Sequence, residues 1–326
     1  MIIIDTENTN PYFNLAAEEY VLKNFDEDCF MLWRNKNCIV VGKNQNTISE
    51  INTDFVKKHN IPVVRRLSGG GAVFHDLGNL NFTFIMNEGS NDFNDFKKFA
   101  TPIIEVLKTL SIDAKFSGRN DITIDYKKIS GNAQYIYKDR VLHHGTLLFS
   151  SNMADLTGAL KPKNTKFQGK GVKSVASRVT NIESYLSKPI SLETFKKKIM
   201  DYVSDKYSSE KIYTFTEKDL NNIDQLVKTK YETWDWNYGS SPKYSFFNEK
   251  KFPGGTVEFH IDVKKGKIQN IKFFGDFFGK KDISHIENKL IGVDHDFDKI
   301  KKVLSSINTQ EYFANIDLDN LISGMF

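Results

Sequence analysis

Residues 65–79 of this 326-residue chain read RRLSGGGAVFHDLGN, a run that places two arginines beside three consecutive glycines. Glycine has no Cβ and adopts positive φ without strain, so successive N–H groups of Gly69–Gly71 can converge on an anion. A guanidinium from Arg65 or Arg66 would add charge and a planar fork of donors. The run therefore predicts a site for phosphate oxygens, although a glycine-rich turn between two strands has the same composition.

The two common phosphate-binding motifs do not describe this run. A Walker loop ends in Gly-Lys-Ser or Gly-Lys-Thr, and a dinucleotide fingerprint spaces its glycines as Gly-x-Gly-x-x-Gly at the start of a helix. Here the glycines lead into Ala72-Val73-Phe74, which has the composition of a strand. We therefore expect the glycines to connect two strands.

Length and composition restrict the class of protein. A chain of 326 residues exceeds one ordinary hydrophobic core, so we expect two domains. The 45 basic and 41 acidic residues give a net charge of only +4, which does not indicate a nucleic-acid partner. The amino terminus lacks a basic signal-peptide region, and no apolar stretch approaches membrane-spanning length. These features predict a cytoplasmic protein with no nucleic-acid or membrane partner.

The cysteine content argues against disulfide or metal chemistry. Cys29 and Cys38 are the only cysteines, and each lies in an apolar, strand-like stretch. Such surroundings favour buried thiols.

Hydrophobic patterning predicts an α+β fold, with mixed or antiparallel sheets flanked by helices. A helix capped by Asn14 precedes short strands that continue to about residue 86. A helix over about 92–110 then leads to a second group of strands over 122–149. These elements belong to one large domain.

The remainder of the chain divides at a run of turn-forming residues. Residues 161–181 are basic and contain glycines, and we interpret them as a loop before further helices. The run Trp234-Asp-Trp-Asn-Tyr-Gly-Ser-Ser-Pro-Lys interrupts the helical pattern. We place a domain boundary there, with a large domain over 1–243 and a small α+β domain over 244–326 that contains a hairpin at 255–275.

Two polar clusters in the large domain have both functional and structural interpretations. Asn120 and Asp121 begin a strand, where an amide oxygen and a carboxylate can bind Mg²⁺ or simply form an Asx turn. Lys127 and Lys128 begin the next strand. Because neighbouring strand residues face opposite ways, only one of these lysines can point inward toward carboxylate and phosphate.

Adjacent histidines begin a third strand. His143 and His144 lie at the head of the apolar strand that ends at Phe149, and they face opposite sides of it. Two residues on opposite faces cannot bind one metal ion. We therefore interpret them as structural histidines.

Five motifs, in this order, make the chain resemble the two-domain lipoate-protein ligases. They are the run at 65–79, Gly-Arg-Asn-Asp at 118–121, Lys-Ile-Ser-Gly-Asn-Ala at 128–133, His-His-Gly-Thr-Leu-Leu-Phe at 143–149, and Lys-Gly-Val-Lys-Ser-Val-Ala-Ser-Arg-Val-Thr-Asn at 170–181. The resemblance covers the whole chain and extends to Trp-Asn-Tyr-Gly and Gly-Gly-Thr-Val-Glu near its end. It implies a catalytic lipoate- and ATP-binding domain over 1–243 and an accessory domain over 244–326.

The resemblance also implies an activity and a set of partners. A ligase of this family activates lipoate with ATP and Mg²⁺ to lipoyl-AMP, releases pyrophosphate, and transfers the lipoyl group to a lysine of an apo lipoyl domain. The acceptors would be the E2 subunits of 2-oxoacid dehydrogenases, the glycine cleavage H protein, or both. We expect the enzyme to be a monomer.

Site residues follow from matching the family motifs position by position. Lys128 would be the inward-facing catalytic lysine, and Asp121 with Asn120 would hold Mg²⁺. The remaining matches would contact ATP or lipoyl-AMP: Arg66, Gly71, Ala72, Val73, Phe74, Lys128, His75 and Lys170. Residues 170–181 would form the loop that covers the adenylate.

Two other functions remain open at this point. Octanoyl and lipoyl transferases share the catalytic fold but need a nucleophilic cysteine, and here both cysteines precede the glycine run in apolar strands. A non-catalytic protein that binds lipoate or adenylate is the second alternative, which intact Arg66, Asp121 and Lys128 disfavour.

Overall fold

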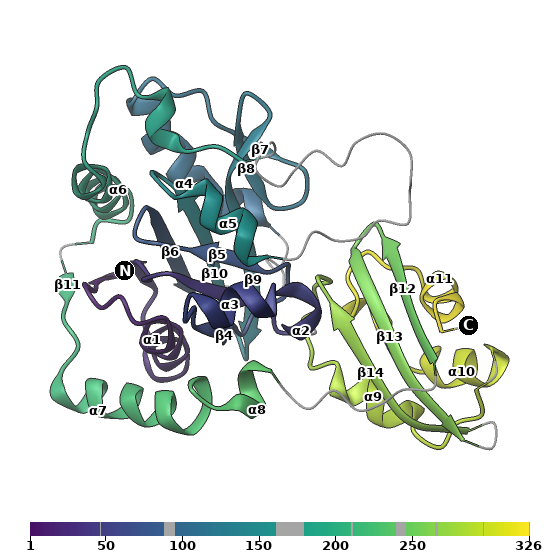
Figure 1. Cartoon of the computed structure of the whole chain (residues 1–326). Coiled ribbons are helices and arrows are strands. Elements are labelled where there is room, and N and C mark those ends of the chain that lie inside the picture. Colours follow the sequence, from purple (N-terminus) through teal and green to yellow (C-terminus); the bar gives the residue numbers. More distant parts are fainter. Residues whose placement is uncertain are drawn as a thin grey trace. The chain divides into compact units, whose positions relative to one another are not determined.

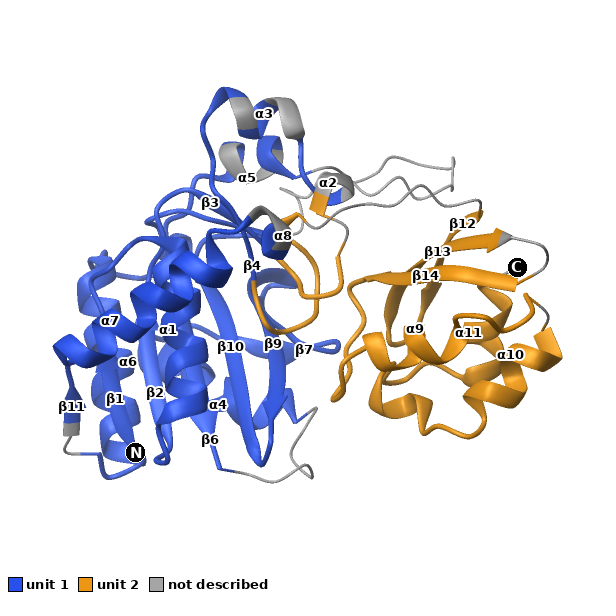
Figure 2. Ribbon diagram, turned by 90° about the horizontal axis from the view of Figure 1, so that it is seen from below, with its two compact units in different colours: residues 1–40, 48–65, 73–237 blue, residues 41–47, 66–72, 238–326 orange. Residues whose placement is uncertain are grey.

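A computed structural model describes residues 1–45, 47–87, 95–160, 179–209, 211–238, 246–264, 267–295 and 297–325 (Figure 1). The chain forms two compact units (Figure 2). The first contains residues 1–40, 48–65 and 73–237, and the second contains residues 41–47, 66–72 and 238–326. The glycines of the 65–79 run thus group with the carboxyl-terminal unit. The functional division at residue 243 remains a prediction.

An eight-stranded mixed sheet forms the centre of the first unit. Its strand order is β11-β1-β2-β6-β10-β9-β8-β7, in which β1 runs parallel to both of its neighbours and the other pairs are antiparallel. This confirms the predicted α+β class. The strands are β1 (Ile2–Asp5), β2 (Cys29–Trp33), β6 (Asn79–Met86), β7 (Lys115–Ser117), β8 (Asp121–Ile124), β9 (Lys127–Tyr137), β10 (Arg140–Leu148) and β11 (Lys211–Tyr213).

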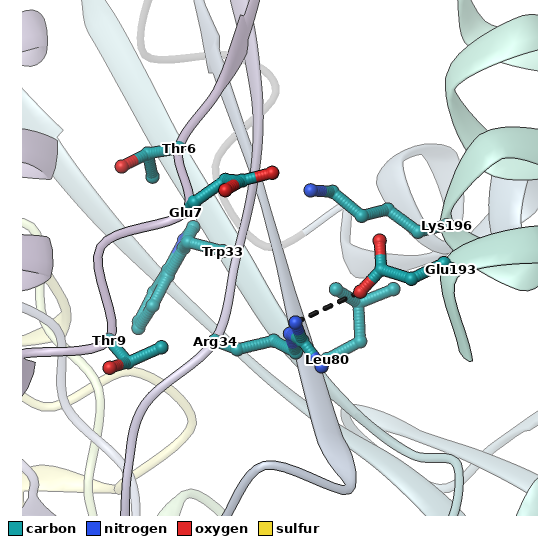
Figure 3. Close-up of a pocket in the computed structure, with 8 residues that line it drawn as sticks. All are labelled: Thr6, Glu7, Thr9, Trp33, Arg34, Leu80, Glu193 and Lys196. Carbon is teal, nitrogen blue, oxygen red and sulfur yellow. Dashed lines mark ion pairs between the residues drawn. The ribbon is translucent and has the colours of Figure 1, made fainter. Parts of the chain in front are cut away.

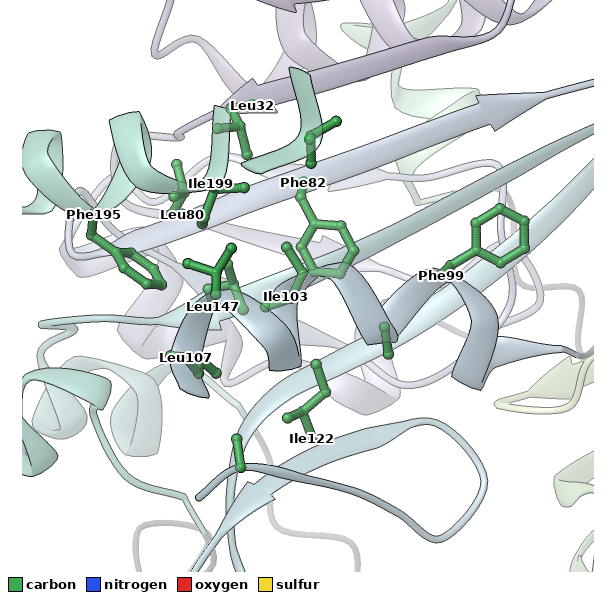
Figure 4. Packing of buried hydrophobic residues seen from close by; sticks show 14 of the residues in the cluster. Leu32, Leu80, Phe82, Phe99, Ile103, Leu107, Ile122, Leu147, Phe195 and Ile199 are labelled. Atoms are coloured by element: carbon green, nitrogen blue, oxygen red, sulfur yellow. The ribbon is translucent and has the colours of Figure 1, made fainter. Parts of the chain in front are cut away.

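Helices α4 and α6 bury the apolar side of this sheet. Phe99 and Ile103 of α4 and Phe195 of α6 belong to one buried cluster with Phe82 of β6 and Leu147 of β10 (Figure 4). All of these side chains are buried, so the sheet and the two helices share one core. The helices of the first unit are α1 (Pro11–Asn24), α3 (Thr53–Lys58), α4 (Phe96–Thr109), α5 (Met153–Ala159), α6 (Leu192–Lys206), α7 (Glu217–Leu226) and α8 (Trp234–Asn237), and α2 (Thr47–Glu50) begins in the second unit.

The first helix begins earlier than the sequence suggested. The side chain of Asn10 accepts a hydrogen bond from the Tyr12 N–H at 2.9 Å, and Pro11 occupies the first helical position. Asn14 lies buried inside the helix, where its Nδ2 donates to the carbonyl oxygens of Asn8 and Arg34. The prediction that Asn14 is the cap was therefore wrong, because Pro11 starts the helix one turn before it.

A small three-stranded sheet surrounds the glycine run. Its order is β4-β3-β5, with β3 (Cys38–Val41) central between β4 (Val63–Arg65) and β5 (Val73–His75). The glycines connect β4 to β5, as expected from the sequence. Cys38 pairs with His75 across this sheet.

Both cysteines are buried and free, which confirms the sequence-based interpretation. Burial raises the pKa of the Cys29 thiol to about 11 and raises the pKa of Cys38 further. Both sulfurs are therefore protonated at neutral pH.

The second unit contains a three-stranded antiparallel sheet with helices on one face. Strands β12 (Phe246–Phe252), β13 (Gly255–Lys264) and β14 (Lys267–Gly275) pair in sequence order. The predicted hairpin at 255–275 is confirmed as β13–β14. Phe259, Ile261 and Phe273 pack in one core with Ile286 and Leu321, which belong to α9 (Ser284–Leu290) and α11 (Leu318–Ser323), and α10 (Phe297–Leu304) completes the helices of this unit.

Within the described ranges, no helix combines the length and apolar character needed to span a membrane.

Asp219 joins α7 to α1 and β11. Its carboxylate accepts hydrogen bonds from the hydroxyls of Tyr213 at 2.6 Å and Tyr20 at 2.7 Å, and from the N–H of the capping residue Thr216 at 2.8 Å. Burial alone would raise the pKa of Asp219, but hydrogen bonds from Tyr213, Tyr20 and Thr216 outweigh burial and lower the pKa to about 2.

Replacing Asp219 by alanine should lower the free energy of unfolding by about 1–3 kcal/mol at pH 7, since four donors lose their acceptor: the hydroxyls of Tyr20, Tyr213 and Thr216, and the Thr216 N–H. A depressed pKa stabilises the fold above the unfolded value of 3.8, and this stabilisation is lost as the pH falls toward about 2. Melting curves followed by circular dichroism should therefore converge for the two proteins in acid. Asp224→Asn is the control, because Asp224 is 56% exposed and pairs only with Lys228 across the helix surface; equal losses in both variants would contradict the prediction.

Candidate active site

Lys128 lies against Asp121 at the edge of the large sheet. The two side chains form an ion pair with Lys128 Nζ 2.8 Å from Asp121 Oδ1, and each is about one-third exposed. Lys127, its neighbour on β9, is exposed. Only one lysine of the pair thus reaches a carboxylate, as the alternation of strand side chains requires.

An irregularity in the strand pairing brings Lys128 to this carboxylate. Asp121 pairs with Gly131 and Ile122 with Ser130, but Thr123 pairs with Lys128, so Ile129 is an extra residue in β9. Without that bulge, Lys128 would lie opposite Ile124 and face away from Asp121. The bulge therefore places Lys128 on the face of Asp121.

Gly131 makes room for the lysine. A Cβ at this position would lie 2.7 Å from Lys128 Nζ, so a side chain here would displace the ammonium group. The carbonyl of Lys128 accepts a hydrogen bond from the Thr180 N–H at 3.0 Å. The end of the predicted adenylate-covering loop therefore returns to the lysine, while residues 161–178, with Lys170 among them, lie outside the described residues.

Asn120 supports the same corner of the site. Its Nδ2 donates to the carbonyl of Asn132 at 2.5 Å, and the Asn132 N–H donates to the carbonyl of Asn120 at 2.9 Å. Asn132 Oδ1 in turn lies 3.2 Å from His143 Nε2. Asn120 thus fixes the start of β8 directly beside Asp121.

Both histidines are buried, which agrees with the structural role that we predict for them. His143 is fully buried and stacks on Phe99 with ring centroids 4.8 Å apart. Burial, and then the nearby His144, holds the pKa of His143 well below its usual range, so the ring is neutral at physiological pH.

His144 belongs to a buried polar cluster that the sequence analysis missed. Its Nδ1 lies 3.0 Å from Glu18 Oε1, and the same oxygen accepts a hydrogen bond from Thr83 Oγ1 at 2.5 Å. Trp33 Nε1 donates to Thr83 Oγ1 at 3.0 Å. The available signal was an acidic residue on the apolar side of the first helix, because a buried carboxylate requires partners.

Arg66 lies inside the loop that the glycines form. Its Nε donates to Ser68 Oγ at 3.1 Å, and its Nη2 donates to the carbonyl oxygens of Gly69 at 2.6 Å and Gly71 at 2.8 Å. The guanidinium is buried in the second unit. It therefore braces the loop and gives it a fixed positive charge.

The glycines of this region fill different structural roles. Gly70 has φ of +92°, which disfavours any other residue there. A Cβ on Gly42 or Gly69 would lie 2.0 Å from the Gly70 carbonyl oxygen or 2.6 Å from that of Phe277. A Cβ on Gly71 would meet nothing within 4 Å. Among the described residues, none packs against the position where a Gly71 side chain would lie.

The remaining predicted ATP contacts lie close in sequence to this loop. Ala72 ends the segment in the second unit, while Val73, Phe74 and His75 form β5 in the first. Phe74 and His75 are buried, and His75 Nδ1 lies 3.1 Å from Asn35 Nδ2. Two groups of predicted residues are thus assembled, one around Lys128 and one around Arg66, in different units.

A polar pocket lies elsewhere in the first unit, near the ends of β1 and β2 (Figure 3). An ion pair between Arg34 Nη2 and Glu193 Oε1 at 2.9 Å crosses part of it. Its lining contains none of the predicted site residues: Thr6, Glu7, Thr9, Trp33, Arg34, Leu80, Glu193 and Lys196. This pocket is therefore distinct from the anion site that the glycine run predicts.

Comparison with known proteins identifies the family. Residues 10–204 match the family model of the lipoyl protein ligase A/B catalytic domain, and residues 241–325 match that of the bacterial lipoate protein ligase C-terminus. The chain belongs to the lipoate-protein ligase family. The predicted resemblance is thereby confirmed, and the protein is a ligase.

Relatives cover nearly the whole ligase. Lipoate–protein ligase 1 of Staphylococcus aureus (strain Mu50) is 48% identical over 96% of each chain, and lipoate-protein ligase LplJ of Bacillus subtilis is 46% identical over 99% of each. LipL1 of P. falciparum, solved in complex with lipoate, has a TM-score of 0.82 and 28% identity over 99% of this chain and 97% of that one.

Two further solved ligase structures match part of this chain. A lipoate-protein ligase A bound with ATP has a TM-score of 0.63 and 26% identity over 73% of this chain and 98% of that one. A bipartite ligase from Thermoplasma acidophilum, from a study that includes its E2 lipoyl domain, has a TM-score of 0.65 and 28% identity over 75% of this chain and 98% of that one.

If Gly71 contacts the nucleotide as the family motif predicts, Gly71→Ala should weaken ATP binding about tenfold or more and leave the melting temperature unchanged, because the added methyl meets no described atom within 4 Å. Isothermal titration with ATP and differential scanning fluorimetry measure the two effects. Gly42→Ala is the matched control and should lower the melting temperature, since its methyl would clash with the Gly70 carbonyl. Unaltered ATP affinity in Gly71→Ala would mean that the nucleotide does not contact Gly71.

Proposed function

We propose that this ligase forms lipoyl-AMP from lipoate and ATP with release of pyrophosphate, and then transfers the lipoyl group to a lysine of an apo lipoyl domain. The observation that carries the proposal is the Lys128–Asp121 pair, because the bulge at Ile129 turns that lysine onto the face of the carboxylate. Membership in the ligase family supports both substrates.

The first step joins two anions. A lipoate carboxylate oxygen forms a bond to the α-phosphorus of ATP, and the bond from that phosphorus to the pyrophosphate oxygen breaks. Negative charge concentrates at the phosphorus as the new bond forms, so fixed cations stabilise the transition state most. In this proposal, Lys128 contacts carboxylate and α-phosphate, and Arg66 contacts phosphate.

The backbone of the glycine run holds the adenylate in this proposal. Gly71 supplies the open space, and Ala72, Val73, Phe74 and His75 line the nucleotide with the strand that follows. Residues around Lys170 close over the mixed anhydride and protect it from water. The hydrogen bond from Thr180 to Lys128 supports a loop that ends at the reacting groups.

The residues around Asp121 fit a magnesium ion that is shared with ATP. Mg²⁺ in nucleotide enzymes binds through one or two carboxylates together with substrate phosphates. Within the described residues there is no group of three or more histidine, cysteine, aspartate or glutamate side chains that could form a complete metal site. Asp121 with Asn120 would hold the ion, which when bound would neutralise phosphate charge.

The second step transfers the lipoyl acyl group to an amine. The incoming lysine must lose a proton before it attacks, because its ordinary pKa is about 10.4. Its nitrogen then bonds to the acyl carbon, and AMP leaves with the electrons of the broken C–O bond. We propose as acceptors the lipoyl domains of 2-oxoacid dehydrogenase E2 subunits or the glycine cleavage H protein, and we propose a monomeric enzyme in the cytoplasm.

The transferase alternative is poorly supported by the thiols. An acyl-transferring cysteine must be accessible and able to ionise, whereas burial raises the pKa of Cys29 to about 11 and that of Cys38 further. Membership in the ligase family argues against the non-catalytic alternative.

The protein incubated with lipoate, ATP, Mg²⁺ and an apo lipoyl domain should increase the mass of the domain by one lipoyl group, because the adenylate supplies the activated acyl carbon. Intact-protein mass spectrometry measures the gain, and omission of ATP is the control. No gain in mass, or an equal gain without ATP, would contradict the ligase assignment.

Lys128→Ala should slow adenylate formation by about 100-fold or more, because the fixed cation at the reacting phosphate is lost. Lys127→Ala should leave the rate nearly unchanged, since Lys127 is exposed. Pyrophosphate release in the absence of acceptor measures this step alone. Loss in Lys127→Ala with activity retained in Lys128→Ala would mean that the wrong lysine of β9 has been assigned.

A further inference from the structure

The chain leaves the first unit after Arg65 and again after Asn237, and these two residues are bonded to each other. The Arg65 N–H donates to Asn237 Oδ1 at 2.9 Å, and Arg65 Nη2 donates to the Asn237 carbonyl at 3.1 Å. They are 172 positions apart in the chain. Two segments that enter the second unit, the glycine run and the carboxyl-terminal part, therefore start from one point.

Trp236 completes this contact, which we call the Arg65 clip (Arg65, Trp236 and Asn237). Arg65 Nε donates to the Trp236 carbonyl at 2.9 Å, and the indole Nε1 of Trp236 donates to the Arg65 carbonyl at 2.8 Å. The backbone N–H, the backbone carbonyl and the guanidinium of Arg65 are thus all bonded to two consecutive residues. Such a set of directional bonds fixes the peptide groups on both sides of Arg65.

The clip is itself anchored in the first unit. Asn237 Nδ2 donates to the Tyr231 carbonyl at 2.6 Å, and the buried Tyr231 hydroxyl donates to Glu19 Oε2 at 2.7 Å. Lys230 also donates to Glu19 and lies 4.0 Å from the Trp236 ring centroid. Trp236 and Asn237 are therefore held to α1 by buried and partly buried polar contacts, so they form a firm support for Arg65.

The residue after Arg65 is the one that braces the glycine loop. The Arg66 N–H donates to the Val41 carbonyl at 3.0 Å, and its guanidinium bonds to the loop carbonyls described above. A rotation of the peptide between residues 65 and 66 would move that guanidinium. Burial lowers the pKa of Arg65 only to about 10, so Arg65 stays charged at neutral pH.

We propose that Arg65 is a positioning residue that sets the orientation of Arg66 and the glycine run toward ATP, with Trp236 and Asn237 as its support. This inference rests on the proposed role of Arg66 at the nucleotide phosphates. In this proposal Arg65 holds the chain, since its guanidinium donates to the carbonyls of residues 236 and 237.

A double-mutant cycle on adenylate formation tests the proposal. Arg65→Met should raise KM for ATP by about tenfold or more, because small displacements of binding groups cost that much, and should leave KM for the acceptor domain unchanged. Arg65→Lys should not rescue the loss, since an ammonium group lacks the planar fork that spans the carbonyls of residues 236 and 237. In an Arg66→Met background, Arg65→Met should cause little further loss of kcat/KM for ATP.

Arg140→Met is the matched control. Arg140 also donates to backbone carbonyls, at 3.0 Å to Leu22 and at 2.6 Å to Glu27, but it lies away from the glycine run in the sequence and the sheet. The fold-loss of kcat/KM for ATP in Arg140→Met should multiply with the fold-loss in Arg66→Met when the two are combined. Trp236→Phe, which removes the indole donor and keeps an aromatic ring, gives the same comparison if Arg65→Met does not fold.

The proposal would be overturned if the losses of kcat/KM for ATP in Arg65→Met and Arg66→Met multiply in the double variant. An equal rise in KM for ATP and for the acceptor domain in Arg65→Met would also overturn it. Wild-type protein in the same assay reports separately on the proposed function. If it forms no lipoyl-AMP, the failure belongs to that function, and titration of ATP binding by calorimetry then serves as the readout for the same cycle.

Discussion

A single extra residue in β9 determines what the candidate site can do. Ile129 breaks the regular pairing with β8, and the break turns Lys128 onto the face that carries Asp121. The Lys128–Asp121 ion pair is partly exposed, and such pairs contribute little to stability. The Lys128 ammonium group can therefore exchange this partner for an anionic ligand at little cost in free energy. Neighbouring features fit this placement: Gly131 clears the path of the lysine, Asn120 fixes the start of β8, and Thr180 returns the chain to the Lys128 carbonyl.

The adjacent residues Arg65 and Arg66 make different contacts because they face different sides of the chain. Neighbouring residues at the end of β4 face different sides, so Arg65 turns toward residues 236–237 while Arg66 enters the glycine loop. An arginine suits both places because its planar fork bonds to several carbonyls at once. In the Arg-Arg motif, Arg65 therefore holds the chain to residues 236–237, and Arg66 places a positive charge in the glycine loop. Neither arginine can replace the other.

Much of this arrangement was predictable from residue patterns, and the failures have physical causes. The glycine run, the buried cysteines, the hairpin at 255–275 and the buried histidines depend on local sequence, and all were found. The helix start was misplaced because Pro11 outweighs Asn14 as a signal. Strand β12 was not predicted because Glu249-Lys250-Lys251 interrupts its apolar pattern. The bulge at Ile129 and the carboxylate of Glu18 depend on partners distant in the chain, which one sequence does not display.

The three glycines of the run look alike in the sequence but have different structural reasons. Gly69 permits close approach to the Phe277 backbone, and Gly70 permits a positive φ, so both are explained by the fold of the second unit alone. Gly71 has no positive φ, and no atom of the described residues lies within 4 Å of where its Cβ would be, so those residues give no packing reason for glycine there. A residue kept small without a packing reason indicates space for something outside the chain. The same loop holds the Arg66 guanidinium, and a fixed charge beside open backbone is what an anionic nucleotide requires.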